Sequence, residues 1–188
     1  MVSLIRNLLF LTGVLALTYV GYTLLEAQEY QASANRELTA ATQAADNGDA
    51  PRAAIHRGDA LGRIDVPRLG LTVAVLEGTS SRVLRLGAGH IEGTALPGEA
   101  GNSGIAGHRD TFFRGLKDIR KDDEIQIQTT GGLTHYEVDW VKVVEPNDTS
   151  VLQALGGEST LTLVTCYPFY LVGPAPKRFV VRAHKSQQ

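Results

Sequence analysis

The segment "DEIQIQT", Asp123–Thr129, alternates polar and apolar residues. In a strand, Ile125 and Ile127 would point to one side of the sheet, and Gln126 and Gln128 to the other. A period of two is typical of a half-buried β-strand, whereas an amphipathic helix repeats about every 3.6 residues. The segment therefore predicts a sheet with one face on a hydrophobic core.

Strand-like segments recur on both sides of this one, separated by turns rich in glycine and proline. They are "LGRIDVP" (61–67), "LTVAVLE" (71–77), "GNSGIAGH" (101–108), "LTHYEVDWVKVVE" (133–145), "STLTLVTC" (159–166) and "KRFVVRA" (177–183). In the longest, the apolar face passes from Val138 and Trp140 to Val141, which predicts a bulge or bend. About seven short strands favour a sandwich or barrel over a parallel α/β sheet.

Short helices are predicted between these strands, at 80–87, 110–119 and 149–155. Asp110 is the expected N-cap of the second, and Thr149 or Ser150 of the third, because these side chains accept hydrogen bonds from a first helical turn. The whole of residues 61–188 is predicted to form one mainly β domain.

The N-terminus carries an uncharged apolar segment from Asn7 to Leu25. At about 1.5 Å per residue, a helix of this length nearly spans a hydrocarbon core of roughly 30 Å. Arg6 precedes it, and Glu26 and Glu29 follow, so the positive-inside rule places the rest of the chain outside the cytoplasm. We interpret residues 1–25 as a single-pass membrane anchor. A cleaved signal peptide is the alternative, but no convincing cleavage site precedes Gln28.

Residues 26–60 differ in composition from the rest of the chain. They are rich in alanine and favour a helix up to about Ala45, after which "DNGDAP" (46–51) breaks it. They hold too few large apolar residues for a core, so we interpret them as a helical or flexible stalk between membrane and domain. A helix packed against the domain remains open.

Charge and cysteine content exclude several classes of function. The net charge is −2, which lacks the basic footprint of a nucleic-acid-binding protein. A single cysteine, Cys166, excludes an intramolecular disulfide and any site built from several cysteines. The acidic segment "KDIRKDDE", 117–124, is interleaved with basic residues, and we interpret it as a solvated turn rather than a metal site.

The phase of its strand turns Cys166 away from the core. Leu161, Leu163 and Thr165 alternate onto the more apolar face, which leaves Cys166 on the other. Arg178 likewise falls on the non-core face of 177–183. A lone cysteine is often an inert, buried small hydrophobe, and that alternative stays open. A reactive thiol needs a neighbouring base or cation to form the thiolate.

Five histidines are candidates for that base: His56, His90, His108, His135 and His184. His108 follows a glycine at a strand-to-helix junction, where close backbone approach leaves a side chain free to project. The connection "YPFYLVGPAPK", 167–177, is apolar and stiffened by three prolines, which suits one wall of a peptide groove. Val164 and Tyr167 are the candidate substrate-binding residues. A plain connection between strands would need fewer residues.

These motifs together resemble the sortases, the cysteine transpeptidases of bacterial surfaces. "TLVTC" (162–166) resembles the sequence around the sortase nucleophile, "GNSGIAGHRDTFFRGL" (101–116) the segment of the catalytic histidine, and Arg178 the arginine on the following strand. "HIEGTALPGE" (90–99) is similar to the family as well, and the resemblance covers residues 61 to about 185. The short C-terminus and "CYPFYLVGPAPKRF" (166–179) resemble class D.

The resemblance implies a closed eight-stranded β-barrel and cleavage of an LPxTG- or LPxTA-like sorting signal after its threonine. It implies that Cys166 forms the thioester, His108 moves protons, and Arg178 stabilises the oxyanion or holds the substrate backbone. The acceptor would be an amine, from a cell-wall peptide or a pilin-like lysine. It implies no cofactor, and we carry over no calcium site.

Two other functions would fit parts of the same pattern. A membrane-anchored binding module would need only an inert Cys166, and thiol labelling would distinguish it. An L,D-transpeptidase would place its histidine close to the cysteine in a compact motif, whereas His108 lies far upstream of Cys166. The absence of a C-x-x-C motif disfavours a disulfide oxidoreductase.

Overall fold

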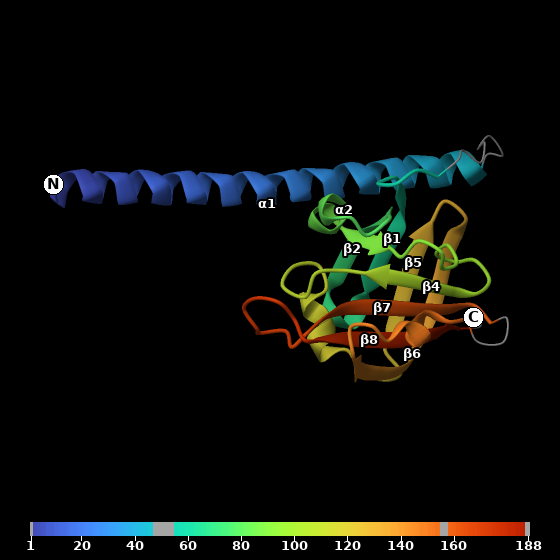
Figure 1. The fold of residues 1–188 in the computed structure, drawn as a ribbon. Coiled ribbons are helices and arrows are strands. Elements are labelled where there is room, and N and C mark those ends of the chain that lie inside the picture. The colour runs from blue at the N-terminus through green and yellow to red at the C-terminus, as the bar shows by residue number, and fades with distance from the viewer. Residues whose placement is uncertain (1, 47–54, 155–157, 187–188) are drawn as a thin grey trace.

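One long helix precedes a barrel of eight strands in the part of the chain that the structure describes (Figure 1). The computed structural model describes residues 2–46, 55–154 and 158–186. The helical elements are α1 (Val2–Asp46), η1 (Pro67–Leu69), α2 (Ser81–Leu86), η2 (Arg114–Asp118) and η3 (Thr149–Leu152). The strands are β1 (Ala60–Val66), β2 (Leu71–Glu77), β3 (Ala88–His90), β4 (Asn102–Ala106), β5 (Glu124–Thr129), β6 (Gly132–Val144), β7 (Thr160–Tyr167) and β8 (Lys177–Lys185).

The strands close into a barrel in the order β1-β2-β3-β4-β7-β8-β6-β5. The pairs β2–β3 and β4–β7 are parallel, and the other pairs are antiparallel. This confirms the predicted mainly β fold with short helices. All the strands expected from the sequence form, and β3 is added. Its sequence, "AGH", is too short to give a period of two.

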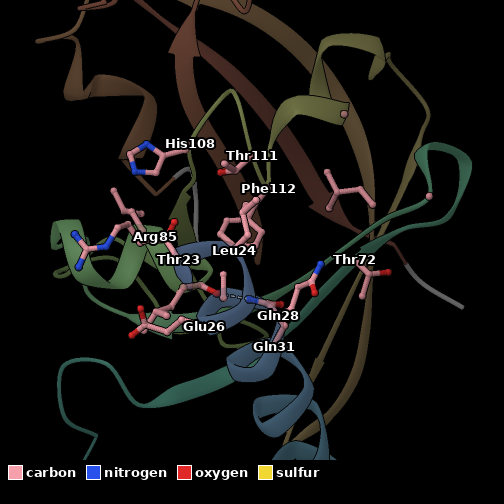
Figure 2. A pocket seen from close by; sticks show the side chains of 16 residues that line it. Thr23, Leu24, Glu26, Gln28, Gln31, Thr72, Arg85, His108, Thr111 and Phe112 are labelled. Carbon is pink, nitrogen blue, oxygen red and sulfur yellow. Dashed lines mark hydrogen bonds between the residues drawn. The ribbon is translucent and has the colours of Figure 1, made fainter. Parts of the chain in front are cut away.

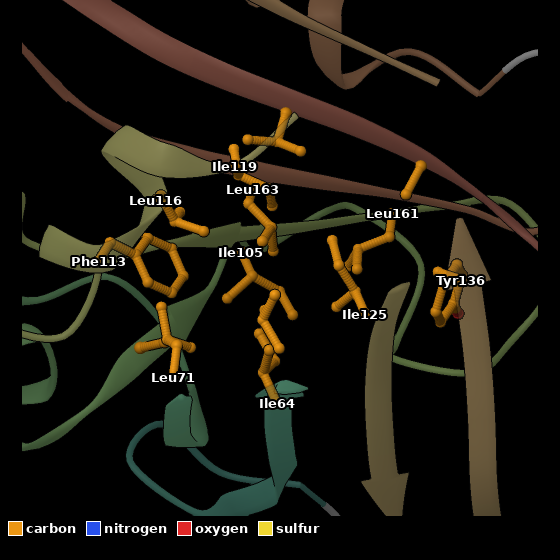
Figure 3. Close-up of a cluster of buried hydrophobic side chains, with 14 of the residues drawn as sticks. Ile64, Leu71, Ile105, Phe113, Leu116, Ile119, Ile125, Tyr136, Leu161 and Leu163 are labelled. Carbon is orange, nitrogen blue, oxygen red and sulfur yellow. The ribbon is translucent and has the colours of Figure 1, made fainter. Parts of the chain in front are cut away.

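Alternation along the strands fills the barrel with side chains (Figure 3). Ile125 and Ile127 are fully buried, as the period of "DEIQIQT" predicted. The predicted bulge in β6 lies between Val138 and Trp140, where the register with β8 shifts. Beyond it, Val141 packs against the core. The largest fully buried side chains include Ile64, Leu76, Ile105, Phe113, Leu116, Leu161, Leu163 and Tyr136.

The predicted helix caps were wrong in detail. Asp110 caps no helix, because η2 begins only at Arg114 and its N-cap, Phe113, makes no side-chain capping bond. In η3 the cap is Asp148, whose carboxylate accepts from the Ser150 amide, rather than Thr149 or Ser150 itself. Both elements are 3-10 turns, which are shorter than the helices expected and therefore start at different residues.

Helix α1 has an exposed apolar part and a second part that packs on the barrel. By length and composition, its segment Val2–Ala40 is apolar enough to cross a membrane. Further along, Gln31 donates from its side chain to the Leu86 carbonyl and accepts from the Ala74 amide. Ala34 and Leu38 are buried there. Of the predicted stalk, residues 26–46 are helical and pack against the domain, the alternative that the sequence left open, whereas 55–60 form a turn and the start of β1. The break predicted at 46–51 begins at the last residue of α1, and its other residues lie outside the described ones.

The acidic segment 117–124 is not simply a solvated turn. The Asp123 carboxylate is buried, pairs with the guanidinium of Arg68 on η1, and accepts from the Arg120 amide at 2.8 Å. Arg68 also donates to the Asp118 carbonyl. The hydrogen bonds from Arg68 hold the pKa of the Asp123 carboxyl below its usual range. A pair of groups distant in sequence therefore fixes this turn to the barrel.

Asp123→Asn is expected to lower the melting temperature at neutral pH by several degrees. Because the folded-state pKa is depressed, the charged carboxylate stabilises the fold above its unfolded pKa of about 3.9, and this contribution disappears as the pH falls through the lower folded-state value. The gap between wild type and variant should therefore narrow below about pH 4. Thermal unfolding between pH 3 and 7 measures both curves.

The matched control is Asp122→Asn, which removes the same charge from an exposed neighbour. Among the described residues this carboxylate pairs with exposed Lys121 alone, so its loss should change the melting temperature little. Equal effects of the two substitutions at neutral pH, or a constant gap across the acid range, would contradict the role assigned to Asp123.

Candidate functional site

The register between β7 and β8 sets Cys166 directly opposite Arg178. Opposed residues of antiparallel strands project to the same face of a sheet, with Cβ atoms about 4.5–5.5 Å apart. Thiol and guanidinium therefore emerge side by side from two separate parts of the sequence. Both residues are half-buried. Arg178 donates from Nη1 to the carbonyls of Ala175 and Lys177, at 3.3 and 3.0 Å.

A second arginine on this face of β8, Arg182, has a structural role. It is buried and donates to the Thr160 hydroxyl at 3.0 Å and to the Val151 carbonyl at 2.7 Å. Burial lowers the pKa of its guanidinium. Arg178 bonds only to main-chain carbonyls beside it among the described residues, so its charge is the one open to a substrate.

His108 reaches the same region from the neighbouring strand. β4 pairs in parallel with β7 as far as Ala106 and Val164. The Gly107 amide then donates to the Val164 carbonyl at 3.1 Å, and the Gly107 carbonyl accepts from the buried Thr165 hydroxyl at 2.7 Å. These bonds bind the backbone just before His108 to the backbone just before Cys166.

Gly107 and Thr165 thus position the candidate site, a role that the sequence did not assign to either residue. Thr165 lies on the core-facing side of β7, where apolar side chains are the rule. A polar residue at such a position is the sequence feature that could have indicated its structural role. Its hydroxyl is satisfied by the Gly107 carbonyl. Gly107 lies so close to the Phe113 ring that an added Cβ would be 2.6 Å from Cδ2.

Gly107→Ala is expected to reduce both stability and turnover. The added methyl group has to displace the fully buried Phe113 ring or the backbone that carries His108, since real Cβ atoms do not approach other atoms so closely. Overpacking of this kind costs about 1–3 kcal/mol. Thermal melting and peptide turnover measure the two effects.

Gly115→Ala is the control for this substitution, because it adds the same methyl group to the same loop. There the new Cβ would meet Leu71 at 3.6 Å, an ordinary contact. We expect little change in either measurement. If Gly107→Ala is tolerated as well as Gly115→Ala, the close packing at Gly107 does not hold His108 in place.

His108 also lines a cavity of about 660 Å³ between α1 and the barrel. Figure 2 shows His108, Thr111 and Phe112 on the barrel side and Leu24 and Glu26 on α1. Cys166 and Arg178 are not among its lining residues. The structure thus brings Cys166 and Arg178 together by register, and it connects His108 to them through the backbone of β7.

The predicted groove wall after Cys166 begins with an aromatic cluster. Tyr167 stacks on Phe179 with ring centroids 6.3 Å apart, and Phe169 meets the same ring edge-on at 5.1 Å. Tyr167 is half-buried by these contacts. Val164 is also half-buried, and its carbonyl accepts from Gly107. Their predicted contacts with substrate stay a prediction.

The other histidines have different surroundings. His90, expected in a loop, ends β3 and is buried, with Nδ1 2.7 Å from the Glu77 carboxylate. His135 lies 2.6 Å from Glu124, and His184 lies 2.7 Å from Asp139. Among residues 2–46, 55–154 and 158–186, no three His, Cys, Asp or Glu side chains are grouped so as to hold a metal ion.

A thiol with a guanidinium opposite and an imidazole just beyond the end of the adjoining strand is an arrangement suited to nucleophilic catalysis. Comparison with known proteins agrees with this class of site. The Sortase domain model matches residues 64–186, and the chain belongs to the sortase family.

Similar proteins include sortases of several classes. Sortase D of Bacillus subtilis is 36% identical over 124 residues, covering 66% of this chain and 63% of that protein. Sortase SrtE1 of Streptomyces coelicolor is 32% identical over 188 residues, covering 87% of this chain and 52% of that protein. The structure of a Clostridium perfringens Sortase D5 transpeptidase has a TM-score of 0.72 and 30% identity, covering 85% of this chain and 99% of that one.

The chain thus spans about half to two thirds of the length of these curated relatives. The matches to Sortase D and Sortase D5 support the resemblance to class D.

Proposed function

We propose that this chain is a membrane-anchored cysteine transpeptidase. It cleaves a sorting signal of the LPxTG or LPxTA type after threonine and transfers the acyl group to an amine. The observation that carries the proposal is the register of β7, which sets Cys166 opposite Arg178 and beside the backbone that bears His108. Membership of the sortase family supports the same chemistry.

The first half of the reaction forms a thioester. The Cys166 thiolate attacks the threonine carbonyl carbon, and Arg178, a strong donor that does not act as a base, stabilises the oxyanion or holds the substrate backbone. The peptide C–N bond breaks, and His108 as imidazolium gives its proton to the leaving amine. The acyl group remains on the sulfur atom.

The second half transfers the acyl group. An acceptor amine, from a cell-wall peptide or a pilin-like lysine, attacks the thioester, and neutral His108 takes its proton. The carbon–sulfur bond breaks, which leaves a new amide and returns Cys166 as thiolate. Each proton and bond is accounted for by residues of this chain, and the proposed reaction needs no cofactor.

The same proposal places the catalytic barrel outside the cytoplasm. Arg6 precedes the apolar part of α1, while Glu26 and Glu29 follow it, so the N-terminus stays inside. Most side chains of this part are exposed in the isolated chain, as lipid contact would require. Substrate and acceptor would then be secreted or surface-bound molecules.

The test uses the full chain in detergent micelles with a panel of LPxTG- and LPxTA-like peptides and an added amine. Mass spectrometry should find the acyl fragment on the peptide that contains Cys166, and an aminolysis product in solution. Absence of an adduct with every peptide, together with resistance of Cys166 to alkylation in the folded chain, would favour a non-catalytic binding module instead.

A further inference from the structure

The connection between β7 and β8 ends in an exposed apolar tip. Tyr170, Leu171 and Val172 have exposed fractions of 77%, 41% and 98%. Outside α1, the only other exposed large apolar residues in the described chain are Ile55, Leu133 and Val143, which are isolated. Three such side chains in succession are costly in water, and groups of this kind mark surfaces that contact another apolar phase.

Basic side chains surround this tip. Arg109, Arg114 and Lys117 line a hollow of about 370 Å³ together with the tip, and Asp110 is the one acidic residue in its lining. Arg109 donates from Nη2 to the carbonyls of Leu171 and Gly173, at 2.6 and 2.8 Å. These bonds hold the tip beside the basic residues. The other terminal nitrogen of Arg109, Nη1, is buried, so Arg109 holds the tip rather than facing outward. Arg114 and Lys117 are exposed, and Lys117 also pairs with exposed Asp118, so Arg114 is the main cation presented beside the tip.

The tip lies at the end of the barrel where α1 becomes apolar. Thr23 and Leu24, at the end of the apolar segment, line one cavity with Thr111, Phe112 and Gly115. The basic residues belong to this same loop. In Figure 1 the β7–β8 connection protrudes from the barrel in the direction in which the N-terminal half of α1 extends, while the turn between β5 and β6 lies at the opposite end.

We propose that the tip, residues 170–172, inserts into the outer interface of the membrane that α1 crosses, with Arg114 on anionic lipid phosphates. Aromatic and aliphatic side chains flanked by arginine and lysine are the composition of interfacial segments. Basic side chains near a bilayer are attracted electrostatically to anionic lipids, and this attraction falls off within about a Debye length of the surface. The barrel then has two membrane contacts, α1 and the tip, and the end of β7 with Cys166 faces the lipid surface.

This second contact would fix the orientation of the candidate site, which a single helix leaves free to rotate about its own axis. It rests on α1 being an anchor but not on the transpeptidase chemistry. The competing occupant of the tip is the sorting-signal peptide, and the experiment separates the two.

Depth-dependent tryptophan quenching tests the proposal in the full chain, reconstituted in vesicles of phosphatidylcholine and phosphatidylglycerol. In a Trp140→Phe, Cys166→Ala background, Val172→Trp becomes the only tryptophan, and excitation at about 295 nm selects it over the tyrosines. Its emission should shift to the blue, and lipids brominated in their acyl chains should quench more than half of it. The same tryptophan substitutions are also made in chains that retain Trp140. Their signal is taken as the difference in quenching from the chain with Trp140 alone, so that a fold weakened by Trp140→Phe cannot mislead the result.

Two control positions frame the result. Leu133→Trp, on an exposed residue of the β5–β6 end, should resemble tryptophan in water, and Leu15→Trp in α1 should be strongly quenched. Arg114→Glu should weaken quenching of Val172→Trp, as should omission of phosphatidylglycerol. The proposal is overturned if Val172→Trp behaves like Leu133→Trp, if it responds only to added sorting-signal peptide, or if Leu15→Trp is unquenched.

Discussion

Replacing Cys166 with alanine is expected to abolish the acyl adduct and to lower peptide turnover by about 10³-fold or more, as loss of a nucleophile does in acyl-transfer enzymes. The remaining groups of the proposed site, His108 and Arg178, would still bind and polarise the substrate but could not accept the acyl group. The fold should survive, because Cys166 is half-buried at the end of a strand and its neighbours Leu163 and Thr165 supply the core contacts.

The measurement combines turnover with labelling, since this is the only cysteine in the chain. Wild type should take up one alkyl group and lose activity in parallel, while Cys166→Ala should take up none. A circular dichroism melt within a few degrees of wild type shows that the variant is folded. Turnover that persists in a folded Cys166→Ala would end the assignment of this residue as the nucleophile.

Arg178→Ala is expected to lower kcat/KM by about 10²–10³-fold, the cost of removing one oxyanion donor. The side chain projects from the same face as the thiol. Its present partners are the carbonyls of Ala175 and Lys177, which water can replace. The rate of Cys166 alkylation should stay largely intact, because the thiol itself is untouched. Arg178→Lys keeps the charge but not the planar fork, so it should recover activity only in part.

Lys177→Ala provides the matched control, because it removes the same charge from the residue of β8 immediately before Arg178. Lys177 is exposed and pairs with Glu145 at 3.4 Å, and it projects to the other side of the strand. Its loss should leave turnover close to wild type. If both substitutions lower turnover equally, Arg178 affects the reaction only through the net charge of the domain and is not an oxyanion donor.

The period of two in the strands predicted most of the barrel. Ile125 and Ile127, or Leu161 and Leu163, alternate with polar residues because a half-buried sheet demands it, and this signal needs no partner strand. The bulge in β6 could be predicted in the same way, because the apolar residues change from one face of the strand to the other. β3 was not, because three residues held by β2 and β4 carry no period of their own.

The caps and the acidic turn escaped prediction because their partners are distant or depend on where a short turn begins. Asp123 is held by Arg68, which lies on the connection between β1 and β2. Nothing in 117–124 indicates that partner. Likewise, the packing of α1 through Gln31 requires main-chain groups of β2 and α2 that propensity does not reveal.

The sequence by itself determined the chemistry available: one thiol turned from the core, a histidine after a glycine, an arginine on the last strand, and an apolar segment long enough to span a bilayer. These are local properties, set by strand phase, composition and length. Only the tertiary structure decided that Cys166 stands opposite Arg178, that Gly107 and Thr165 join His108 to the same strand, and that the β7–β8 tip shares its end of the barrel with the apolar part of α1. Those relations depend on register and on parallel pairing between distant segments, where hydrogen bonds and close packing select one arrangement that no single stretch of sequence specifies.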